Sequence, residues 1–260
     1  MFKFDPQSHY MMPAHFGPRV SKGSARYGDV TTMAVTYLTD RDMLARYLPE
    51  PFEVGQEPLI SVSYSMYREI EWLAGGSYNV VGVSASAVFS GEVDHLEGIF
   101  SLVMWENLTD PILVGREVFG IPKIYAEIED HTIFQGEWRT SASYRGHKIV
   151  DIMVKDLNPV THGQTEGVGG LMCFKYIPKI GEPGAEVSYA TLFPASGTTK
   201  EAWIGTGEVR WHHLTWEQNP TQYHIVNALE ELPIIEYRAA MVTKGSSDLS
   251  VPSEPARPLR

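Results

Sequence analysis

The chain has 260 residues, of which 43% are hydrophobic and 20% are charged, as in an ordinary folded globular protein. This composition excludes a fibrous repeat and a largely disordered chain. The formal net charge is -11, with 21 Lys and Arg residues and no basic run, which argues against a nucleic-acid partner because phosphate binding needs clustered cations.

Cysteine content and hydropathy bear on where the protein works. Cys173 is the only cysteine, so no internal disulfide can form. The first residues, MFKFDPQSHYMMP, contain an acid and prolines and lack the apolar centre of a signal peptide. No run reaches the ~18 apolar residues that a membrane helix needs. We therefore expect a cytoplasmic protein without a membrane segment.

One domain is expected to cover residues 1–260. Residues 1–26 form a Pro-, Gly- and His-rich arm without periodicity, residues 27–245 form the body, and residues 246–260 form a Ser- and Pro-rich tail that we expect to be flexible.

The body is rich in short β-prone runs. Val, Ile, Tyr, Phe and Thr dominate these runs, which begin with DVTTMAVTYLTD, PLISVSYSMY and NVVGVSASAVFSG. Helices are expected in TDRDMLARYLPEP, where Thr39 or Asp40 can cap the first turn, and from Pro220 through TQYHIVNALEEL. The excess of strands predicts a mainly β (α+β) fold, an antiparallel barrel or sandwich with a few peripheral helices.

The candidate for chemistry is Lys123, in the stretch GREVFGIPKIYAEIE. It stands among apolar residues, and no other lysine lies between Lys22 and Lys148. Burial removes water from an ammonium group and favours the neutral amine, which attacks ketones to form Schiff bases. The alternative is a lysine whose amine reaches water at a strand edge.

The block GREVFGIPK, preceded by IFSLVMWENLTDPILV, resembles the lysine segment of the acetoacetate decarboxylase family. YLTDRDMLARYLPEPFEV, FKYIP, EAWIGTGEVRW and ALEELPIIE follow the order expected of that family, so the resemblance covers residues 29–241. It implies a cone-shaped antiparallel β-barrel with a buried active-site cavity, a homo-oligomer, and Lys123 as a Schiff-base lysine that needs no cofactor.

The chain also departs from the decarboxylases of that family. Their reactive lysine is followed by a second lysine, where this chain has Ile124. They also carry a glutamate two residues after a tyrosine, where this chain reads Tyr78-Asn79-Val80. Other members of the superfamily keep the lysine and act as pyruvate-dependent aldolase-dehydratases. This likeness favours an imine between Lys123 and a small oxo acid such as pyruvate, followed by condensation with an aldehyde and loss of water, or the reverse reaction.

Two alternatives stay open: decarboxylation of acetoacetate or another β-keto acid, and a barrel that binds an apolar ligand without turnover. His212 and His213 are adjacent and have no carboxylate or cysteine at a metal-ligand spacing, so we expect no metal site.

Four further residues are candidates for the site. If the segment is a strand, Glu117 faces the same side as Lys123 and Arg116 the other, and Gly120 and Pro122 weaken that parity.

Arg116 is a candidate to hold a substrate carboxylate and Glu117 to shuttle protons, and the alternative is an ion pair between them. Tyr78 and Tyr237 are candidate hydroxyl donors for dehydration, and the alternative is that both simply pack in the core. The run GQTEGVGG, residues 163–170, is expected to be a loop beside the pocket.

Overall fold

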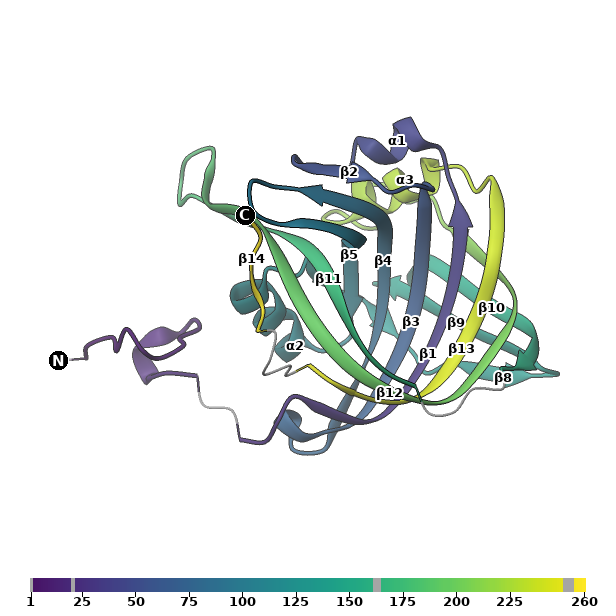
Figure 1. Cartoon of the computed structure of the whole chain (residues 1–260), viewed down its shortest axis with the longest axis horizontal. Coiled ribbons are helices and arrows are strands. Elements are labelled where there is room, and N and C mark those ends of the chain that lie inside the picture. The colour runs from purple at the N-terminus through teal and green to yellow at the C-terminus, as the bar shows by residue number, and fades with distance from the viewer. Residues whose placement is uncertain (1, 20–21, 161–164, 250–254) are drawn as a thin grey trace.

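The computed structural model describes residues 2–19, 22–160, 165–249 and 255–260, with the backbone alone for residues 165–169 (Figure 1). Most strands join one sheet. The strands are β1 (Arg26–Leu38), β2 (Phe52–Val54), β3 (Leu59–Ile70), β4 (Gly76–Ser90), β5 (His95–Glu106), β6 (Lys123–Tyr125), β7 (Glu127–Ile128), β8 (Thr132–Phe134), β9 (Glu137–Tyr144), β10 (His147–Pro159), β11 (Thr165–Pro178), β12 (Ala185–Trp211), β13 (Glu236–Asp248) and β14 (Arg257–Pro258). The helices are α1 (Arg41–Ala45), α2 (Thr109–Val114) and α3 (Tyr223–Glu231), with short helical turns η1 (Ala14–Phe16), η2 (Glu71–Leu73) and η3 (Gly115–Phe119).

The sheet closes into a ring, as a β-barrel fold requires. Its order is β11-β5-β4-β3-β1-β13-β12-β10-β9-β7, and β11 also pairs along its whole length with the first half of β12. The second half of β12 pairs with β10 and β13. Nearly all pairings are antiparallel, which confirms the predicted mainly β fold. The exceptions are the parallel pairs β5–β6 and β5–β11.

The strands β3, β4 and β5 separate two interiors. On one face of β5, Val103 and Trp105 belong to the main hydrophobic core, which also receives residues of β10 and α3. The alternate residues Met104 and Glu106 face the other side, where a cavity opens. Because successive side chains of a strand point to opposite faces, one strand builds both interiors.

The predicted helices are present and shorter than expected. Asp40 caps α1, because its Oδ1 accepts a hydrogen bond from Met43 N at 2.9 Å. Helix α3 starts at Tyr223 rather than at Pro220. The residue before it, Gln222, accepts a hydrogen bond from the indole nitrogen of Trp105 at 2.8 Å, which ties this helix to the core.

Two local features differ from the sequence analysis. Arg116 and Glu117, whose facing was considered for a strand, lie in the helical segment 109–119 (α2 and η3), because Thr109, Asp110 and Pro111 suit a first helical turn and Gly120 ends the helix with a φ of 75°. Residues 165–170 begin strand β11 rather than lying in a loop, since they pair with β12, and residues 163–164 lie outside the described residues.

The end of the chain is also more ordered than predicted. Strand β14 pairs with β12, and Arg257 forms an ion pair with Asp94 at 2.7 Å. Leu259 is buried in a small apolar cluster with Phe52 and Phe100. Residues 257–260 are therefore docked on the body rather than loose.

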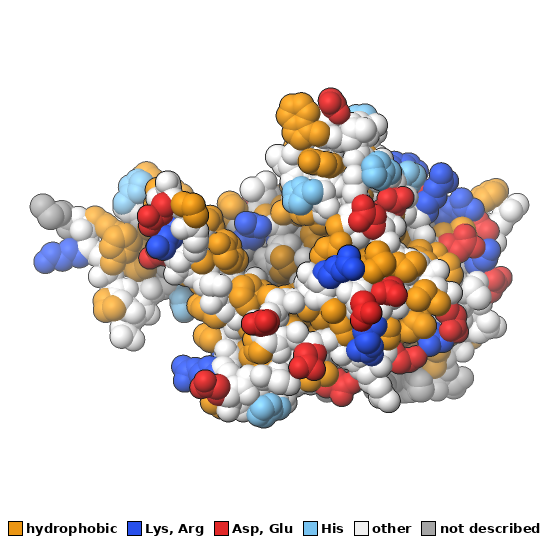
Figure 2. All heavy atoms as spheres, turned by 90° about the horizontal axis from the view of Figure 1, so that it is seen from above, with side chains coloured by type: hydrophobic (Ala, Val, Ile, Leu, Met, Phe, Trp, Pro, Cys, Tyr) orange, Lys and Arg blue, Asp and Glu red, His pale blue; other side chains and the backbone are white. Residues whose placement is uncertain are grey.

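The N-terminal arm projects away from the barrel (Figures 1 and 2). Its aromatic side chains Phe2, Phe4 and Tyr10 pack edge-to-face on one another. Met12 and Phe16 are 77% and 82% exposed. Large apolar side chains thus lie on a protruding surface that the described body does not cover.

Within the described residues, none of the helices has the length and apolar character needed to cross a bilayer.

Candidate active site

Lys123 lies in the wall of a cavity of about 570 Å³ on the far side of the sheet from the main core. Lys123 begins β6, which runs parallel to β5 with Met104 opposite Lys123 and Trp105 opposite Ile124. Lys123 therefore shares the cavity face with Met104 and Glu106, whereas Ile124 packs against the main core. The position that carries a second lysine in the resembled decarboxylases thus faces away from the cavity.

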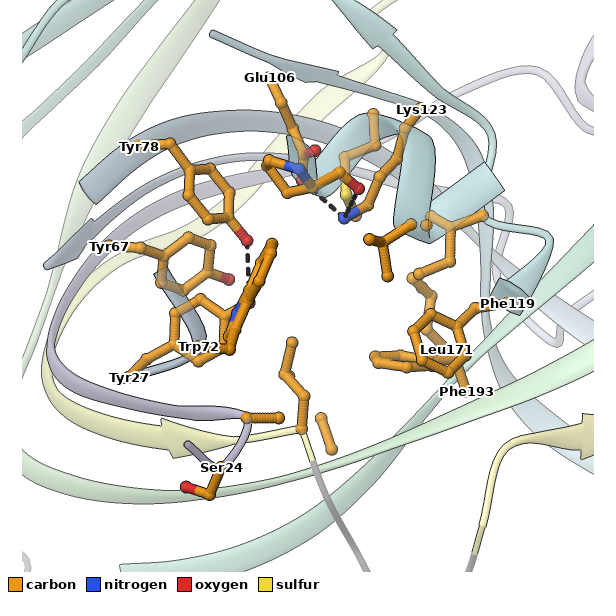
Figure 3. A pocket seen from close by; sticks show the side chains of 18 of the residues that line it. Ser24, Tyr27, Tyr67, Trp72, Tyr78, Glu106, Phe119, Lys123, Leu171 and Phe193 are labelled. Carbon is orange, nitrogen blue, oxygen red and sulfur yellow. Dashed lines mark hydrogen bonds and ion pairs between the residues drawn. The ribbon is translucent and has the colours of Figure 1, made fainter. Parts of the chain in front are cut away.

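The amine of Lys123 is held by a buried carboxylate (Figure 3). Its Nζ lies 2.8 Å from Oε1 of Glu106, and the two side chains are 9% and 1% exposed. Nζ also donates a hydrogen bond of 3.3 Å to the backbone carbonyl of Pro111. The other oxygen of Glu106, Oε2, is buried and has no hydrogen-bond partner among the described residues.

Burial raises the pKa of the Glu106 carboxyl, and the neighbouring Lys123 opposes that shift. A higher pKa of Glu106 brings the neutral pair, a carboxylic acid beside a free amine, closer in free energy to the ionic pair. The free amine is the nucleophilic form of lysine, so a neighbouring carboxyl group that accepts its proton favours attack on a ketone.

Tyrosines line the cavity wall next to this pair (Figure 3). The hydroxyls of Tyr27 and Tyr78 share a hydrogen bond of 3.1 Å, and the indole nitrogen of Trp72 donates one of 3.2 Å to Tyr27. Tyr67 packs against both tyrosine rings. Burial raises the pKa of Tyr67 to about 12 and that of Tyr78 well above its usual value, so these hydroxyls keep their protons.

The opposite wall is apolar. It is formed by Phe119, Leu171 and Phe193, which face the tyrosines across the cavity (Figure 3). The Phe119 and Phe193 rings pack with centroids 4.8 Å apart. Cys173 is fully buried beside this wall, and burial raises the pKa of its thiol to about 12. The cavity therefore joins one polar end, at Lys123 and Glu106, to a large apolar end.

A glycine makes room for the lysine. Gly115 links α2 to η3 with a helical φ of -61°, so its backbone demands no glycine. A Cβ placed there would lie 2.6 Å from Cε of Lys123 and 3.1 Å from its Nζ, closer than van der Waals contact permits. Gly115, the first glycine of GREVFGIPK, thus leaves room for the side chain of Lys123 in its observed position.

The remaining sequence candidates lie elsewhere. Arg116 is exposed, and its guanidinium donates a hydrogen bond of 2.9 Å to the backbone carbonyl of Lys123. Glu117 accepts a hydrogen bond of 3.2 Å from Met12 N of the N-terminal arm. Among the described residues, neither is part of the cavity lining.

Tyr237 is also remote, since its hydroxyl is hydrogen-bonded at 3.1 Å to the backbone of Val209 on the main-core side. Of the predicted site residues, the structure brings together Lys123 and Tyr78.

Sequence reasoning missed Glu106. The available signal was a single acid at the end of the apolar run IFSLVMWE, followed by a helix-compatible segment and the lysine strand. A strand, a short helix and a second strand in that order favour a parallel pair. The observed register, with Met104 opposite Lys123, then places Glu106 and Lys123 on one face. A buried acid of this kind needs a cation nearby.

We predict that Gly115→Ala displaces the amine without unfolding the protein. The helical φ tolerates alanine, so the melting temperature should stay close to wild type. Reductive trapping of a small ketone on Lys123 should slow by ~10²-fold, as expected for a misplacement of about 1 Å. Gly98→Ala in β5 is the matched control, because its added Cβ meets only Met172 Cε at 3.6 Å. Equal trapping rates in the two variants would contradict this role of Gly115.

We also predict that Lys123→Met destabilises the fold in a pH-dependent way. The change leaves the Glu106 carboxylate buried without its cation, which costs roughly 3–5 kcal/mol when the group is charged. Because the folded-state pKa of Glu106 then lies further above its unfolded value, the loss should be small below the unfolded pKa of ~4.3 and should grow as pH rises through the folded pKa.

Urea unfolding at pH 5 and pH 8 measures this dependence. The double variant Lys123→Met/Glu106→Leu removes both charges and should recover most of the lost stability at pH 8. A single variant that loses the same free energy of unfolding at both pH values would rule out an uncompensated Glu106 charge as the cause.

The sequence and the fold of the chain are similar to those of known proteins. The model of the acetoacetate decarboxylase family matches residues 11–248. The acetoacetate decarboxylase of Burkholderia ambifaria strain MC40-6 is 25% identical in an alignment 228 residues long, which covers 84% of this chain and 83% of that protein. The acetoacetate decarboxylase of Burkholderia multivorans is 26% identical over 227 residues, with the same coverage.

Solved structures share the fold. One of acetoacetate decarboxylase has a TM-score of 0.74 at 18% identity and covers 96% of this chain and 95% of its own. The enduracididine biosynthesis enzyme MppR, complexed with pyruvate, has a TM-score of 0.72 at 14% identity and covers 99% of both chains. An acetoacetate decarboxylase-like enzyme from Sphingomonas wittichii RW1 has a TM-score of 0.68 at 14% identity, covering 97% of this chain and 99% of its own. Because the family model matches nearly the whole chain, the protein belongs to the acetoacetate decarboxylase family.

Proposed function

We propose that the protein is a cofactor-independent lyase in which Lys123 forms an imine with a small oxo acid, pyruvate in the first instance. The imine carbon skeleton then condenses with an aldehyde and loses water, or the reverse reaction runs. The observation that carries this proposal is the amine of Lys123, buried in the cavity wall 2.8 Å from the carboxylate of Glu106.

The ion pair suits imine formation because the charge balance is kept. A lysine ammonium and a ketone give an iminium and water, so one positive charge is replaced by another. Glu106 can therefore be the counter-ion of the nitrogen both before and after imine formation. The iminium is an electron sink, which accepts the electron pair of a broken C–H or C–C bond next to the former carbonyl carbon.

The size of the cavity favours condensation over the decarboxylation of acetoacetate. Its volume of about 570 Å³ lies within the ~300–1,000 Å³ of sites that enclose drug-sized ligands, far more than a four-carbon acid fills. The apolar wall of Phe119, Leu171 and Phe193 suits the side chain of an aromatic or aliphatic aldehyde. MppR, which shares the fold, has also been solved with the condensation product of pyruvate and imidazole 4-carboxaldehyde.

Two substitutions add to this choice. Val80 takes the place of the glutamate of the resembled decarboxylases and packs in an apolar cluster with Tyr27 and Tyr78. Ile124 takes the place of their second lysine and faces the main core. The two charged groups that the resembled decarboxylases carry at these positions are therefore absent from this chain.

Decarboxylation of a β-keto acid is the second candidate, and Glu106 supports it. A buried carboxylate beside the iminium would repel the carboxylate of the bound substrate and favour its loss as carbon dioxide. The third candidate, a barrel that only binds an apolar ligand, is disfavoured by the same pair, since burying two charges is costly and serves no purpose in an apolar binding site.

Borohydride trapping tests the proposal. Pyruvate with borohydride should add the mass of a reduced pyruvate imine to Lys123 alone, and Lys123→Arg should abolish the adduct. If the mass of the treated protein is unchanged, under conditions in which a known Schiff-base aldolase is labelled, the imine proposal is wrong and the ligand-binding barrel is favoured.

The products separate the two lyase reactions. We expect condensation of pyruvate with benzaldehyde to give a conjugated product that absorbs in the near ultraviolet. Acetone release from acetoacetate should stay close to the uncatalysed rate. Rapid acetone release without condensation would instead establish the decarboxylase.

We further propose that the chain forms a homo-oligomer through its N-terminal arm. The exposed side chains of Phe4, Met12 and Phe16 on this arm, 62%, 77% and 82% exposed, support the proposal because protruding apolar surface marks a protein interface. Sedimentation velocity should show an oligomer for the full chain and a smaller species for Phe4→Ser/Phe16→Ser. A full chain that sediments as a monomer would contradict the proposal.

A further inference from the structure

We infer that Glu106 is the catalytic acid–base of the site, and that its Oε2 takes a proton from the carbon next to the imine and delivers it to the aldehyde oxygen. The inference rests on the proposed imine at Lys123. It concerns a residue that the sequence reasoning did not include, and it removes that role from Glu117.

The geometry of the carboxylate carries the inference. Oε1 of Glu106 is occupied by the amine of Lys123 at 2.8 Å, whereas Oε2 is buried and has no hydrogen-bond partner in the described structure. Glu106 lines the cavity, so the free oxygen belongs to a group that borders the space a substrate would enter. Buried polar atoms without a partner are few in folded proteins, and a catalytic role is one explanation of them.

Proton transfer requires Oε2 to reach the atom that loses the proton. In a pyruvate imine the methyl carbon is bonded to the carbon that is double-bonded to Nζ. Glu106 contacts Nζ through Oε1, so its carboxylate lies beside the imine. In the proposed step, a rotation of the Glu106 side chain turns Oε2, which is buried in the free site, toward the neighbouring C–H bond.

The other titratable groups around the cavity are poor proton acceptors. Burial raises the pKa of Tyr67, Tyr78 and Tyr27, so their hydroxyls stay protonated at neutral pH. The thiol of Cys173 also keeps its proton, with a pKa of about 12. Among the described lining residues, this leaves Glu106 as the carboxylate, because Arg19 and Lys123 are cations.

Glu117 does not compete for this role. Its Oε2 accepts a hydrogen bond from Met12 N at 3.2 Å, and its backbone carbonyl accepts one from Lys175 at 2.6 Å. It is therefore an anchor for the N-terminal arm and for strand β11, outside the cavity lining of the described residues.

Glu106 transfers one proton in two stages. Glu106 Oε2 takes a proton from the methyl group of the iminium, and the electron pair of that C–H bond forms the C=C bond. The π pair of the C=N bond moves onto nitrogen, so the iminium becomes a neutral enamine and the carboxylate a neutral acid. The C=C pair of the enamine then forms a bond to the aldehyde carbon, and the lone pair on nitrogen re-forms the C=N bond of the iminium. The π pair of the aldehyde C=O bond moves onto oxygen, which takes the proton from the Glu106 acid and leaves the carboxylate. Burial raises the pKa of the Glu106 carboxyl toward neutral pH. A carboxyl group with a raised pKa can both accept the proton from carbon and donate it to oxygen.

Methyl exchange of pyruvate in deuterium oxide, followed by proton NMR, tests this role apart from imine formation. Wild-type protein should exchange the methyl protons, and Glu106→Gln should exchange them at least ~10²-fold more slowly, the usual contribution of a general base. The amide keeps the shape and can still accept a hydrogen bond from Nζ, so borohydride should still trap pyruvate on Lys123. Glu106→Asp keeps the carboxylate and should restore part of the exchange.

Controls and outcomes keep the inference separate from the proposed function. Glu97→Gln, an exposed acid on the same strand β5, should exchange at the wild-type rate. Failure of wild-type protein to trap pyruvate would refute the imine itself. Trapping with wild-type exchange in Glu106→Gln, or loss of exchange in Glu117→Gln alone, would overturn the role of Glu106. Loss of trapping in a folded Glu106→Gln would also overturn it, since Glu106 would then serve imine formation rather than methyl proton transfer.

Discussion

The buried ion pair between Lys123 and Glu106 is the constraint on which the rest of the site depends. Two charges 2.8 Å apart on side chains that are almost fully buried are stable only as a pair, because either charge alone is costly to bury. Gly115 leaves room for the lysine chain, Arg116 holds the backbone of Lys123, and Pro111 offers a carbonyl to its amine. Each of these contacts helps to hold the amine beside the carboxylate. The residues around Lys123 in the sequence therefore serve to position its Nζ.

The alternation of a single strand couples this pair to the stability of the whole barrel. Trp105 packs in the main core, and the next residue, Glu106, faces the cavity. The packing of Trp105 therefore fixes the position of Glu106 along the cavity wall. On β6 the same rule sends Lys123 to the cavity and Ile124 to the core. A second lysine at Ile124 would therefore enter an apolar core rather than approach the first amine, and charge repulsion from that position is not available to tune Lys123.

The parts of this picture that the sequence predicts are those with local signals. Strand composition predicts the β fold, Asp40 marks the start of its helix, and the GREVFGIPK block singles out Lys123. Glu106 could not be found from a local signal, because its place beside Lys123 depends on the parallel pairing of β5 with β6. The periodicity of either strand alone does not predict that pairing. Assigning Arg116 and Glu117 by strand parity failed because their segment is helical, where successive residues turn by about 100° rather than 180°. Tyr237 is a plausible hydroxyl donor in sequence, yet its partner, the backbone of Val209, is set by tertiary structure.

The two ends of the cavity place different demands on a substrate. The end at Lys123 and Glu106 contains one positive and one negative group, so it has no spare cation for a carboxylate once the imine has formed. Arg19, on the arm at the edge of the lining, is the remaining cation among the described lining residues. A substrate with a carboxylate directed toward Arg19 and an apolar group directed toward Phe119 and Phe193 would match these two parts of the lining. An oxo acid joined to an aromatic aldehyde has that arrangement, whereas acetoacetate offers nothing to the apolar wall.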